Sequence, residues 1–280
     1  MTQRPRRARR SQLSVPGSSE KMLQKGAESA ADHVFCDLED AVAPSVKVEA
    51  RDKIAWALNT LDWGKKTRCV RINDVTTEWC HGDIITVVEK AGANIDTIML
   101  TKPYGAADVV FLDRMLLQLE KRLKLDRRIG IEVLIEEVQA LQNVEEISRC
   151  SDRLECLIFG MGDYSGSQGI DTRDIGGDGG YPGDIFHYAR WRITMAARAA
   201  GIDASTDPTP ISRTRTASAR RPSGPRPWAW SASGPSTPPR SRRRWRCFPP
   251  ARPRSPVPAG CGTPISRPRP AVWARCRWTE

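Results

Sequence analysis

The stretch "IGIEVLIEEVQALQNVEEISR" (129–149) contains one complete strand–helix unit, and it decides the fold. Residues 129–135 form a short, mostly apolar run, and residues 137–149 carry apolar side chains at helical spacing. A run with so few polar residues is typical of a strand covered on both faces of a sheet. Glu136 stands between the two elements, where a buried strand would give way to its helix.

The same alternation recurs over the first 204 residues. Expected strands cover 12–15, 33–39, 68–73, 97–101, 129–135 and 156–160. Expected helices cover 18–31, 46–60, 107–124 and 137–149. Strands that alternate with helices in this way predict an α/β fold, with a parallel sheet and helical crossovers.

Two parallel-sheet folds compete. An open dinucleotide-binding sheet needs a Gly-rich turn after its first strand, and "VPGSS" (15–19) lacks the GxGxxG spacing. A barrel instead carries its functional residues at the C-terminal ends of its strands, where this chain has its unusual polar residues. We therefore expect a (β/α)8 TIM barrel. It should be incomplete, with about six βα units before Ala204 where a closed barrel has eight.

The composition changes abruptly after Ala204. Residues 205–280 contain 16 Arg, no Lys, two acids and 16 of the 21 Pro. The first 204 residues have a net charge of −3, although the whole chain carries +11. We expect a basic disordered arm over 1–10, a partial TIM-barrel catalytic domain over 11–204 and an Arg/Pro-rich disordered tail over 205–280.

Other bulk properties exclude several classes of protein. The eight cysteines form no CxxC pair and no zinc-type cluster, which is typical of a reduced intracellular protein. No apolar run approaches the roughly 18 residues of a membrane span. The N-terminus lacks the apolar region of a secretory signal. We expect a cytoplasmic protein that binds no membrane.

Two acids follow neighbouring expected strands. Glu136 follows "IEVLI", and Asp163 follows "LIFGMG". Carboxylates at adjacent strand ends can converge on one hard cation, and magnesium takes one or two of them together with substrate oxygens. The alternative is that each acid caps the helix that follows it. We expect a Mg²⁺ site, with Mn²⁺ as the other candidate ion.

Charged residues also stand at three other strand ends, and two of them are cations that could bind an anion. Arg71 lies in the apolar run "CVRIN", where a cation is costly unless it is paired or points into a polar mouth. It either pairs with Glu39 or Asp40, or stabilises an anion that forms during a reaction. Lys102 either binds an anion or pairs with an acid. The histidines have no metal-ligand spacing, and we interpret each as structural or exposed: His33, His81 and His187.

A magnesium site and an arginine in one barrel mouth suit a reaction that passes through an enolate. The metal would hold a 2-oxo or 2-hydroxy acid, and Arg71 would stabilise the enolate oxygen. That chemistry describes a retro-aldol or retro-Claisen cleavage of a C–C bond.

Longer motifs narrow this hypothesis. The segment "RSQLSVPGSSEKMLQKGAESAADHVFCDLEDAVAPSVKVEARDKI" (10–54) resembles the opening of the citrate lyase β-subunit-like family. The segments "LNTLDWGKKTRCVRIN" (58–73), "IGIEVLIEEVQALQNVEEI" (129–147) and "RLECLIFGMGDYSGS" (153–167) resemble its malyl-CoA lyases. Those enzymes cleave malyl-CoA, and often β-methylmalyl-CoA, to glyoxylate and an acyl-CoA.

The resemblance implies a barrel of the pyruvate/phosphoenolpyruvate-dependent type that assembles as a trimer or hexamer. It puts Glu136 and Asp163 on the family's magnesium ligands, Arg71 on its catalytic arginine and Lys25 on a lysine that meets coenzyme A phosphates. Glu39 and Asp40 match its acidic "LED" motif.

This chain also departs from the family pattern at two places. Ser19 stands where these enzymes often have a coenzyme-binding Arg, and the loop 171–191 is shorter than theirs. The acyl-CoA is therefore left open, and cleavage of citramalyl-CoA or citryl groups is the alternative within the family.

The tail has three interpretations. It is a Pro-rich linker, a nucleic-acid-binding arm with 16 Arg and five Trp, or a translation in the wrong reading frame. Shifting the frame back by one nucleotide lets 205–215, 227–241 and 275–280 encode "IDGP", "KWAIHP" and "DG", three motifs with which the family continues. We expect a frameshift after Ala204, and hence a printed chain that is poorly soluble and impaired in activity, a pseudo-enzyme by accident, with no nucleic-acid partner.

Overall fold

Parallel strands lie in chain order in one curled sheet, so each strand pairs with its sequence neighbours. The computed structural model describes residues 4–170 and 185–206, all within one unit, Met1–Pro235. In these ranges the sheet has seven strands: β1 (Gln12–Pro16), β2 (His33–Asp37), β3 (Thr67–Arg71), β4 (Thr97–Leu100), β5 (Gly130–Ile135), β6 (Leu154–Phe159) and β7 (Asp203–Thr206). The expected incomplete α/β barrel is confirmed.

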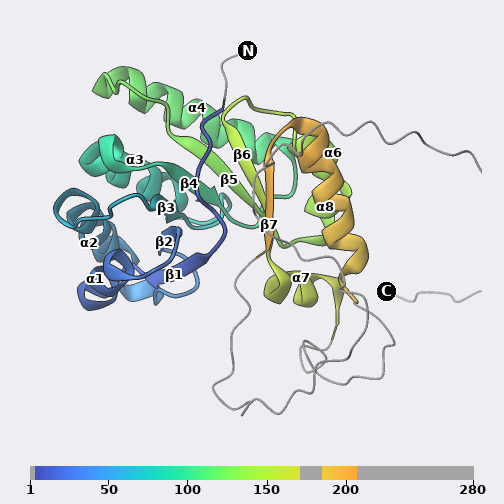
Figure 1. Cartoon of the computed structure of the whole chain (residues 1–280), viewed down its shortest axis with the longest axis horizontal. Coiled ribbons are helices and arrows are strands. Elements are labelled where there is room, and N and C mark those ends of the chain that lie inside the picture. Colours follow the sequence, from blue (N-terminus) through green and yellow to red (C-terminus); the bar gives the residue numbers. More distant parts are fainter. Residues whose placement is uncertain (1–3, 171–184, 207–280) are drawn as a thin grey trace, which may run out of the picture. The chain divides into compact units, whose positions relative to one another are not determined.

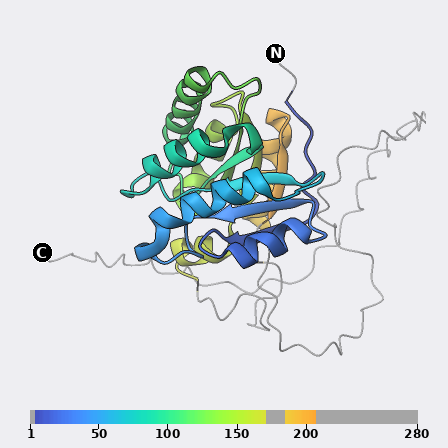
Figure 2. The ribbon, with the colours of Figure 1, turned by 90° about the vertical axis from the view of Figure 1, so that its left-hand side faces the viewer.

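Helices connect the strands and cover the outside of the sheet (Figure 1). They are α1 (Glu20–Glu28), η1 (Pro44–Val46), α2 (Lys47–Thr60), α3 (Cys80–Ala91), η2 (Gly92–Asn94), α4 (Ala106–Leu123), α5 (Val138–Gln142), α6 (Val144–Ile147), α7 (Met161–Gln168) and α8 (His187–Ala200). Figure 2 shows α1 to α4 side by side, and each packs against the next. No described helix is both long and apolar enough to cross a membrane.

The structure differs from the sequence expectation in several elements. Helices α3, α7 and α8 stand where the expected set has no helix. A seventh strand follows the six expected ones, and it continues past Ala204 through Ser205 and Thr206. The helix expected over 137–149 is divided at Asn143 into α5 and α6. The remainder of the tail, 207–280, lies outside the described residues, as does 171–184 in the loop expected to be short.

Strand side chains alternate between two apolar layers. One set, such as Val34, Val70 and Ile98, packs outward under the helices. The other set forms a separate cluster inside the curl: Phe35, Cys69, Met99, Leu134, Cys156 and Ile158. This inner cluster divides the interior into two polar ends. We call the N-terminal end of the strands the floor and the C-terminal end the mouth.

The floor is closed by the N-terminal arm, which the sequence predicted to be disordered over 1–10. In the structure, side chains of the arm contact the floor from Arg4 onward. Arg9 is 2% exposed and pairs with Glu132 of β5 at 2.9 Å, Glu155 of β6 at 2.6 Å and Asp203 of β7 at 3.0 Å. Strand acids at the floor therefore neutralise an arginine of the arm and hold the arm in place.

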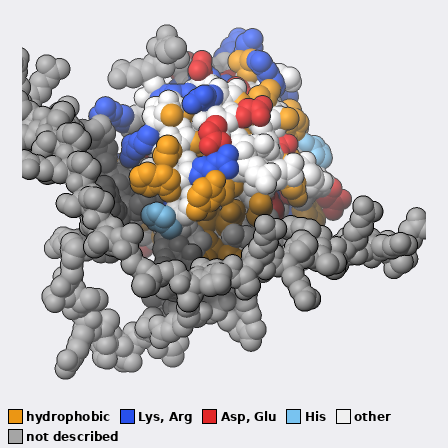
Figure 3. Space-filling model, turned by 90° about the vertical axis from the view of Figure 1, so that its right-hand side faces the viewer, with side chains coloured by type: hydrophobic (Ala, Val, Ile, Leu, Met, Phe, Trp, Pro, Cys, Tyr) orange, Lys and Arg blue, Asp and Glu red, His pale blue; other side chains and the backbone are white. Residues whose placement is uncertain are grey.

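One outer face carries exposed apolar side chains. Tyr188, Trp191 and Met195 lie one turn apart along α8 and are each more than half exposed. Figure 3 shows hydrophobic side chains gathered among charged ones on the face that carries this helix. The described residues leave this stripe open to solvent.

Arg9→Met tests whether the ion pairs of Arg9 at the floor stabilise the fold. It leaves the buried Glu132 carboxylate without its arginine, and removing one partner of a buried ion pair costs about 3–5 kcal/mol. We expect that loss in urea unfolding followed by circular dichroism. The control is Arg10→Met, because the 73% exposed Arg10 side chain pairs with Asp32 at the surface and a pair of that kind contributes less than about 1 kcal/mol. Equal losses would contradict this assignment.

Glu132 gives the floor a pH dependence. Burial alone would raise the pKa of this carboxyl, but the charges of His33 and Arg9 outweigh it and lower the pKa. A carboxyl with a lowered folded-state pKa adds stability above its unfolded pKa of about 4.5, and that stability is lost as the pH falls through the folded value. The stability difference between the natural chain and Glu132→Gln should thus be largest near neutral pH and shrink in acid. A pH-independent difference would exclude this origin.

Candidate active site

The mouth collects charged residues from successive strand ends. Asp37 ends β2, and Glu39 and Asp40 follow it. Arg71 ends β3, Lys102 follows β4, Glu136 follows β5, and Asp163 lies in the first turn of α7 after β6. The structure thus brings together six of the seven residues singled out from the sequence. It does not bring in Lys25, which is exposed in the last turn of α1 and joins none of the mouth interactions of the described residues.

Arg71 is fixed by Asp37. Its Nε donates to Asp37 Oδ1 at 2.7 Å and its Nη2 to Oδ2 at 2.5 Å, a two-point contact between paired strands. Asp37 is fully buried and also accepts the backbone N–H groups of Glu39 and Ala41. Burial works against the Arg71 charge, but the Asp37 carboxylate outweighs it and raises the pKa. Arg71 is therefore a permanently charged, oriented cation.

Asp37 is the mouth residue to which the sequence reasoning gave no role of its own. It belongs to residues 36–42 of the quoted stretch 10–54, in which only Glu39 and Asp40 were given roles. The signal was present, since strand residues of one parity share a face. Asp37 is two positions before Glu39 and pairs in register with Arg71.

Lys102 lies between the acids. Its ammonium contacts Glu39, Asp163 Oδ2 at 3.2 Å and Asp40 Oδ1 at 3.4 Å. Its backbone N–H donates to Glu136 Oε1 at 2.9 Å. The residue has φ 47°, a left-handed conformation that non-glycine residues rarely adopt and that occurs often at functional sites. Of the two sequence alternatives for Lys102, the structure shows the pairing with acids.

The surroundings of Glu136 and Glu39 disfavour their charged forms. Burial and the nearby Glu39 and Asp163 charges raise the pKa of Glu136 well above its ordinary value. Burial also raises the pKa of Glu39. Glu39 Oε2 is buried without a hydrogen bond, although Arg71 Nη1 approaches it at 3.3 Å without hydrogen-bond geometry.

This donor set fits a divalent cation. Five carboxylates face two cations in the mouth, so negative charge is in excess. The unpartnered Glu39 oxygen and the raised pKa of Glu136 are the local signs of that excess. Hard oxygen donors of this kind suit Mg²⁺ or Mn²⁺. Glu136 and Asp163, the two acids expected from the sequence to bind it, both belong to this set.

A second group of potential ligands lies at the floor. His33 Nε2, Cys69 Sγ and a Glu132 oxygen lie within 4.8 Å of one another, the one such three-residue group in the ranges described. Arg9 already neutralises Glu132, and burial together with the Glu132 charge raises the pKa of the Cys69 thiol well above its ordinary value. This group is an ion network, in keeping with the structural interpretation of His33. His81 and His187 are exposed.

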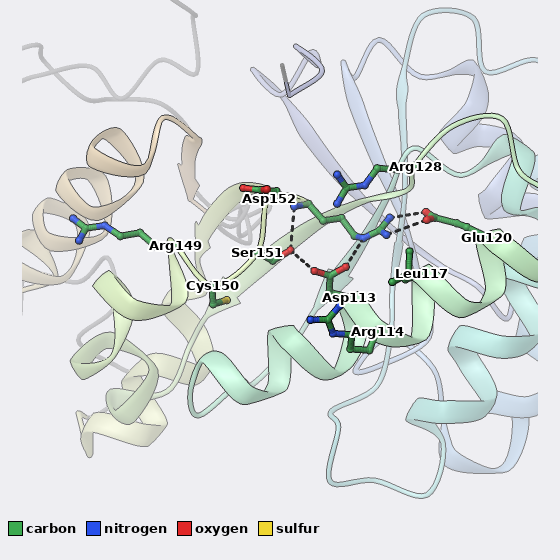
Figure 4. A pocket seen from close by; sticks show the side chains of 10 residues that line it. Asp113, Arg114, Leu117, Glu120, Arg128, Arg149, Cys150, Ser151 and Asp152 are labelled. Carbon is green, nitrogen blue, oxygen red and sulfur yellow. Dashed lines mark hydrogen bonds and ion pairs between the residues drawn. The ribbon is translucent and has the colours of Figure 1, made fainter. Parts of the chain in front are cut away.

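A pocket also lies away from the mouth, beside the start of β6 (Figure 4). Arg153 runs through it, donating to Glu120 Oε1 at 2.5 Å, Asp113 Oδ1 at 2.9 Å and the Ile129 carbonyl at 2.8 Å. The central charges of this pocket are thus paired with one another and join α4 to the strands.

Comparisons with known proteins agree with this architecture. A family model described as HpcH/HpaI aldolase/citrate lyase matches residues 10–220. The L-malyl-CoA/β-methylmalyl-CoA lyase of Cereibacter sphaeroides is 39% identical over 208 residues, which cover 71% of this chain and 65% of that protein. The chain thus spans about two thirds of that relative's length.

Two further proteins are similar. The malyl-CoA/β-methylmalyl-CoA/citramalyl-CoA lyase of Chloroflexus aurantiacus is 31% identical, covering 62% of this chain and 56% of that protein. Among solved structures, protein CitE of Mycobacterium tuberculosis in complex with magnesium, acetoacetate and coenzyme A is 26% identical. The TM-score of the match is 0.58, and the match covers 73% of this chain and 67% of that one.

Gly160→Ala tests whether the Glu136 side chain is tightly packed. A Cβ at Gly160 would lie 2.7 Å from Glu136 Cβ and 2.8 Å from Oε2, so Glu136 must move. We expect a loss of about 1–3 kcal/mol in denaturant unfolding, as for other overpacked sites. Gly162→Ala is the matched control: a Cβ there meets nothing within 4 Å, so stability should be unchanged or higher. Equal effects of the two changes would show that Glu136 is not tightly seated.

Proposed function

The chain belongs to the HpcH/HpaI aldolase/citrate lyase family, and we propose that it is a Mg²⁺-dependent carbon–carbon lyase. Its substrate is a 3-hydroxyacyl-CoA, malyl-CoA or β-methylmalyl-CoA. The products are glyoxylate and acetyl-CoA or propionyl-CoA. The observation that carries the proposal is the buried, doubly bonded Arg71 in one mouth with Glu136 and Asp163.

The charges of the mouth suit this cleavage. Glu136 and Asp163 would hold the cation, which would supply positive charge to the oxygens of the glyoxylate part. Asp37 occupies two N–H groups of Arg71, and the guanidinium keeps three more for an oxygen that becomes negative. The electron pair of the broken C–C bond moves onto the thioester oxygen, where Arg71 stabilises the enolate.

Protons must also move. The substrate hydroxyl loses its proton as the bond breaks, and Glu39, whose raised pKa makes it a stronger base than an ordinary carboxylate, accepts it. The enolate carbon takes up one proton in exchange, which gives the acyl-CoA product. Asp40 helps to hold Lys102. We assign a coenzyme A contact to Lys25, on the sequence resemblance, and a contact with the anionic substrate to Lys102, because its ammonium lies in the mouth.

The acyl group has one specific alternative. The relative from Chloroflexus aurantiacus has citramalyl-CoA in its name, so a citramalyl-CoA or citryl substrate is the second candidate. We also propose a cytoplasmic homo-oligomer, a trimer or hexamer, and the exposed α8 stripe of Tyr188, Trp191 and Met195 supports such an assembly.

The tail bears on whether this chain is active. We propose that residues 205–280 are read out of frame, which the three encoded family motifs support. The catalytic aspartate of the family's "DG" loop is then missing from the chain as printed. The nucleic-acid alternative depends on the tail and predicts binding that weakens steeply with salt.

The test is glyoxylate release from malyl-CoA with Mg²⁺, by the chain as printed and by a chain with the frame restored after Ala204. We expect the restored chain to be active, to stop when Mg²⁺ is chelated and to lose about 100-fold or more in kcat with Arg71→Met. Arg122→Met, which removes an exposed cation on α4, serves as the control. Release of no glyoxylate by the restored chain contradicts the proposed reaction, and full activity of the printed chain contradicts the frameshift.

A further inference from the structure

Lys47 is a buried lysine that the reaction above does not use. It is the first residue of α2 and is 5% exposed. Its ammonium donates to the Leu38 carbonyl at 2.8 Å, the Glu39 carbonyl at 2.7 Å and Asn73 Oδ1 at 2.6 Å. All three N–H groups of the ammonium are thus occupied.

The burial of this charge is costly. Burial lowers the pKa of Lys47, although the surrounding carboxylates of Glu39, Asp37, Asp83 and Asp40 raise it. The ammonium also lies 5.3 Å from the centre of the Trp79 ring. A position that needed only packing would take an apolar side chain, because a buried cation must first lose its hydration. The contacts that offset this loss go to the segment that carries Glu39.

Asn73 extends the contact to the next strand and helix. Its Nδ2 donates to the Leu38 carbonyl at 3.0 Å and to Asp83 Oδ2 at 2.6 Å. Asp83, in α3, also accepts from Arg51 of α2 at 2.8 Å. Lys47 is therefore anchored in a network that joins the ends of β2 and β3 to the two helices behind them.

The main chain of Glu39 is held at both of its polar groups. Its N–H donates to Asp37 Oδ1 at 2.8 Å, and its carbonyl accepts from Lys47. With the backbone fixed, the carboxylate faces Lys102 on one side and Arg71 on the other. Glu39 thus keeps the Lys102 ammonium among the acids of the mouth.

We propose that Lys47 is a positioning residue for the cation site: by fixing Glu39, it keeps the Lys102 ammonium shared between Glu39 and Asp163 and so limits the competition of Lys102 with the metal for Asp163. The proposal rests on the metal role given to Glu136 and Asp163 under the proposed function. Without Lys47, Glu39 moves, and the Lys102 ammonium, which already contacts Asp163 Oδ2 at 3.2 Å, pairs with Asp163 more fully, in competition with the metal. Loss of an outer partner of this kind weakens metal binding about 10–100-fold.

The experiment compares Lys47→Met with Arg153→Met in the full chain. Arg153 is an equally buried cation, but it lies at the pocket beside the start of β6. Three quantities are measured: thermal stability, Mn²⁺ affinity by electron paramagnetic resonance, and amide hydrogen exchange over residues 38–43. Both variants should lose stability. Only Lys47→Met should weaken Mn²⁺ binding at least about tenfold and speed exchange in this segment.

The outcomes separate the two proposals. Unchanged Mn²⁺ affinity in Lys47→Met overturns the positioning role and leaves the proposed function standing. If the chain without substitutions does not bind Mn²⁺, the metal role of Glu136 and Asp163 is overturned. Hydrogen exchange over residues 38–43 then decides whether Lys47 fixes this segment. Lys47→Gln, which keeps a donor but not the charge, should show a smaller change in the same direction, and it replaces Lys47→Met if that variant does not fold.

Discussion

The curl of the parallel sheet is the constraint on which the rest of the structure depends. Side chains alternate along a strand, so every second residue of each strand points into the interior. An apolar cluster around Phe35, Met99 and Leu134 fills the middle of that interior. Polar residues on the inner face are thereby confined to the floor and the mouth. Each end must balance its own charge, because the apolar cluster separates the two.

The two ends achieve this balance differently. At the floor, three acids surround Arg9, and burial with good hydrogen bonds makes a closed ion network. At the mouth, Arg71 and Lys102 face more carboxylates than they neutralise, and an oxygen of Glu39 has no hydrogen bond. Similar residue types therefore serve stability at one end and suit a cation and an anionic intermediate at the other. The pKa directions agree, since the pKa of Glu132 in β5 is lowered and that of Glu136, directly after β5, is raised.

Sequence reasoning predicted the barrel and the strand ends because periodicity and strand polarity are local properties. Six of the residues chosen that way meet in the mouth. It did not predict the contacts of the arm with the floor, because a run of arginines is disordered unless buried acids accept it, and Glu132, Glu155 and Asp203 lie far away in sequence. It missed Asp37 and Lys47 for a similar reason: their partners belong to other strands or to the main chain. Lys25 shows the converse case, since a family motif assigned a role that the geometry of the mouth does not include.

The most direct test of this account uses the two buried glutamates of β5 and the turn after it. Glu132→Gln and Glu136→Gln each remove one carboxylate charge, at the floor and at the mouth. Mn²⁺ titration of the full chain, followed by electron paramagnetic resonance, measures the affinity of each variant. The account predicts that Glu136→Gln loses Mn²⁺ binding whereas Glu132→Gln retains it. Loss of binding in Glu132→Gln alone would place the metal at the floor and contradict the account.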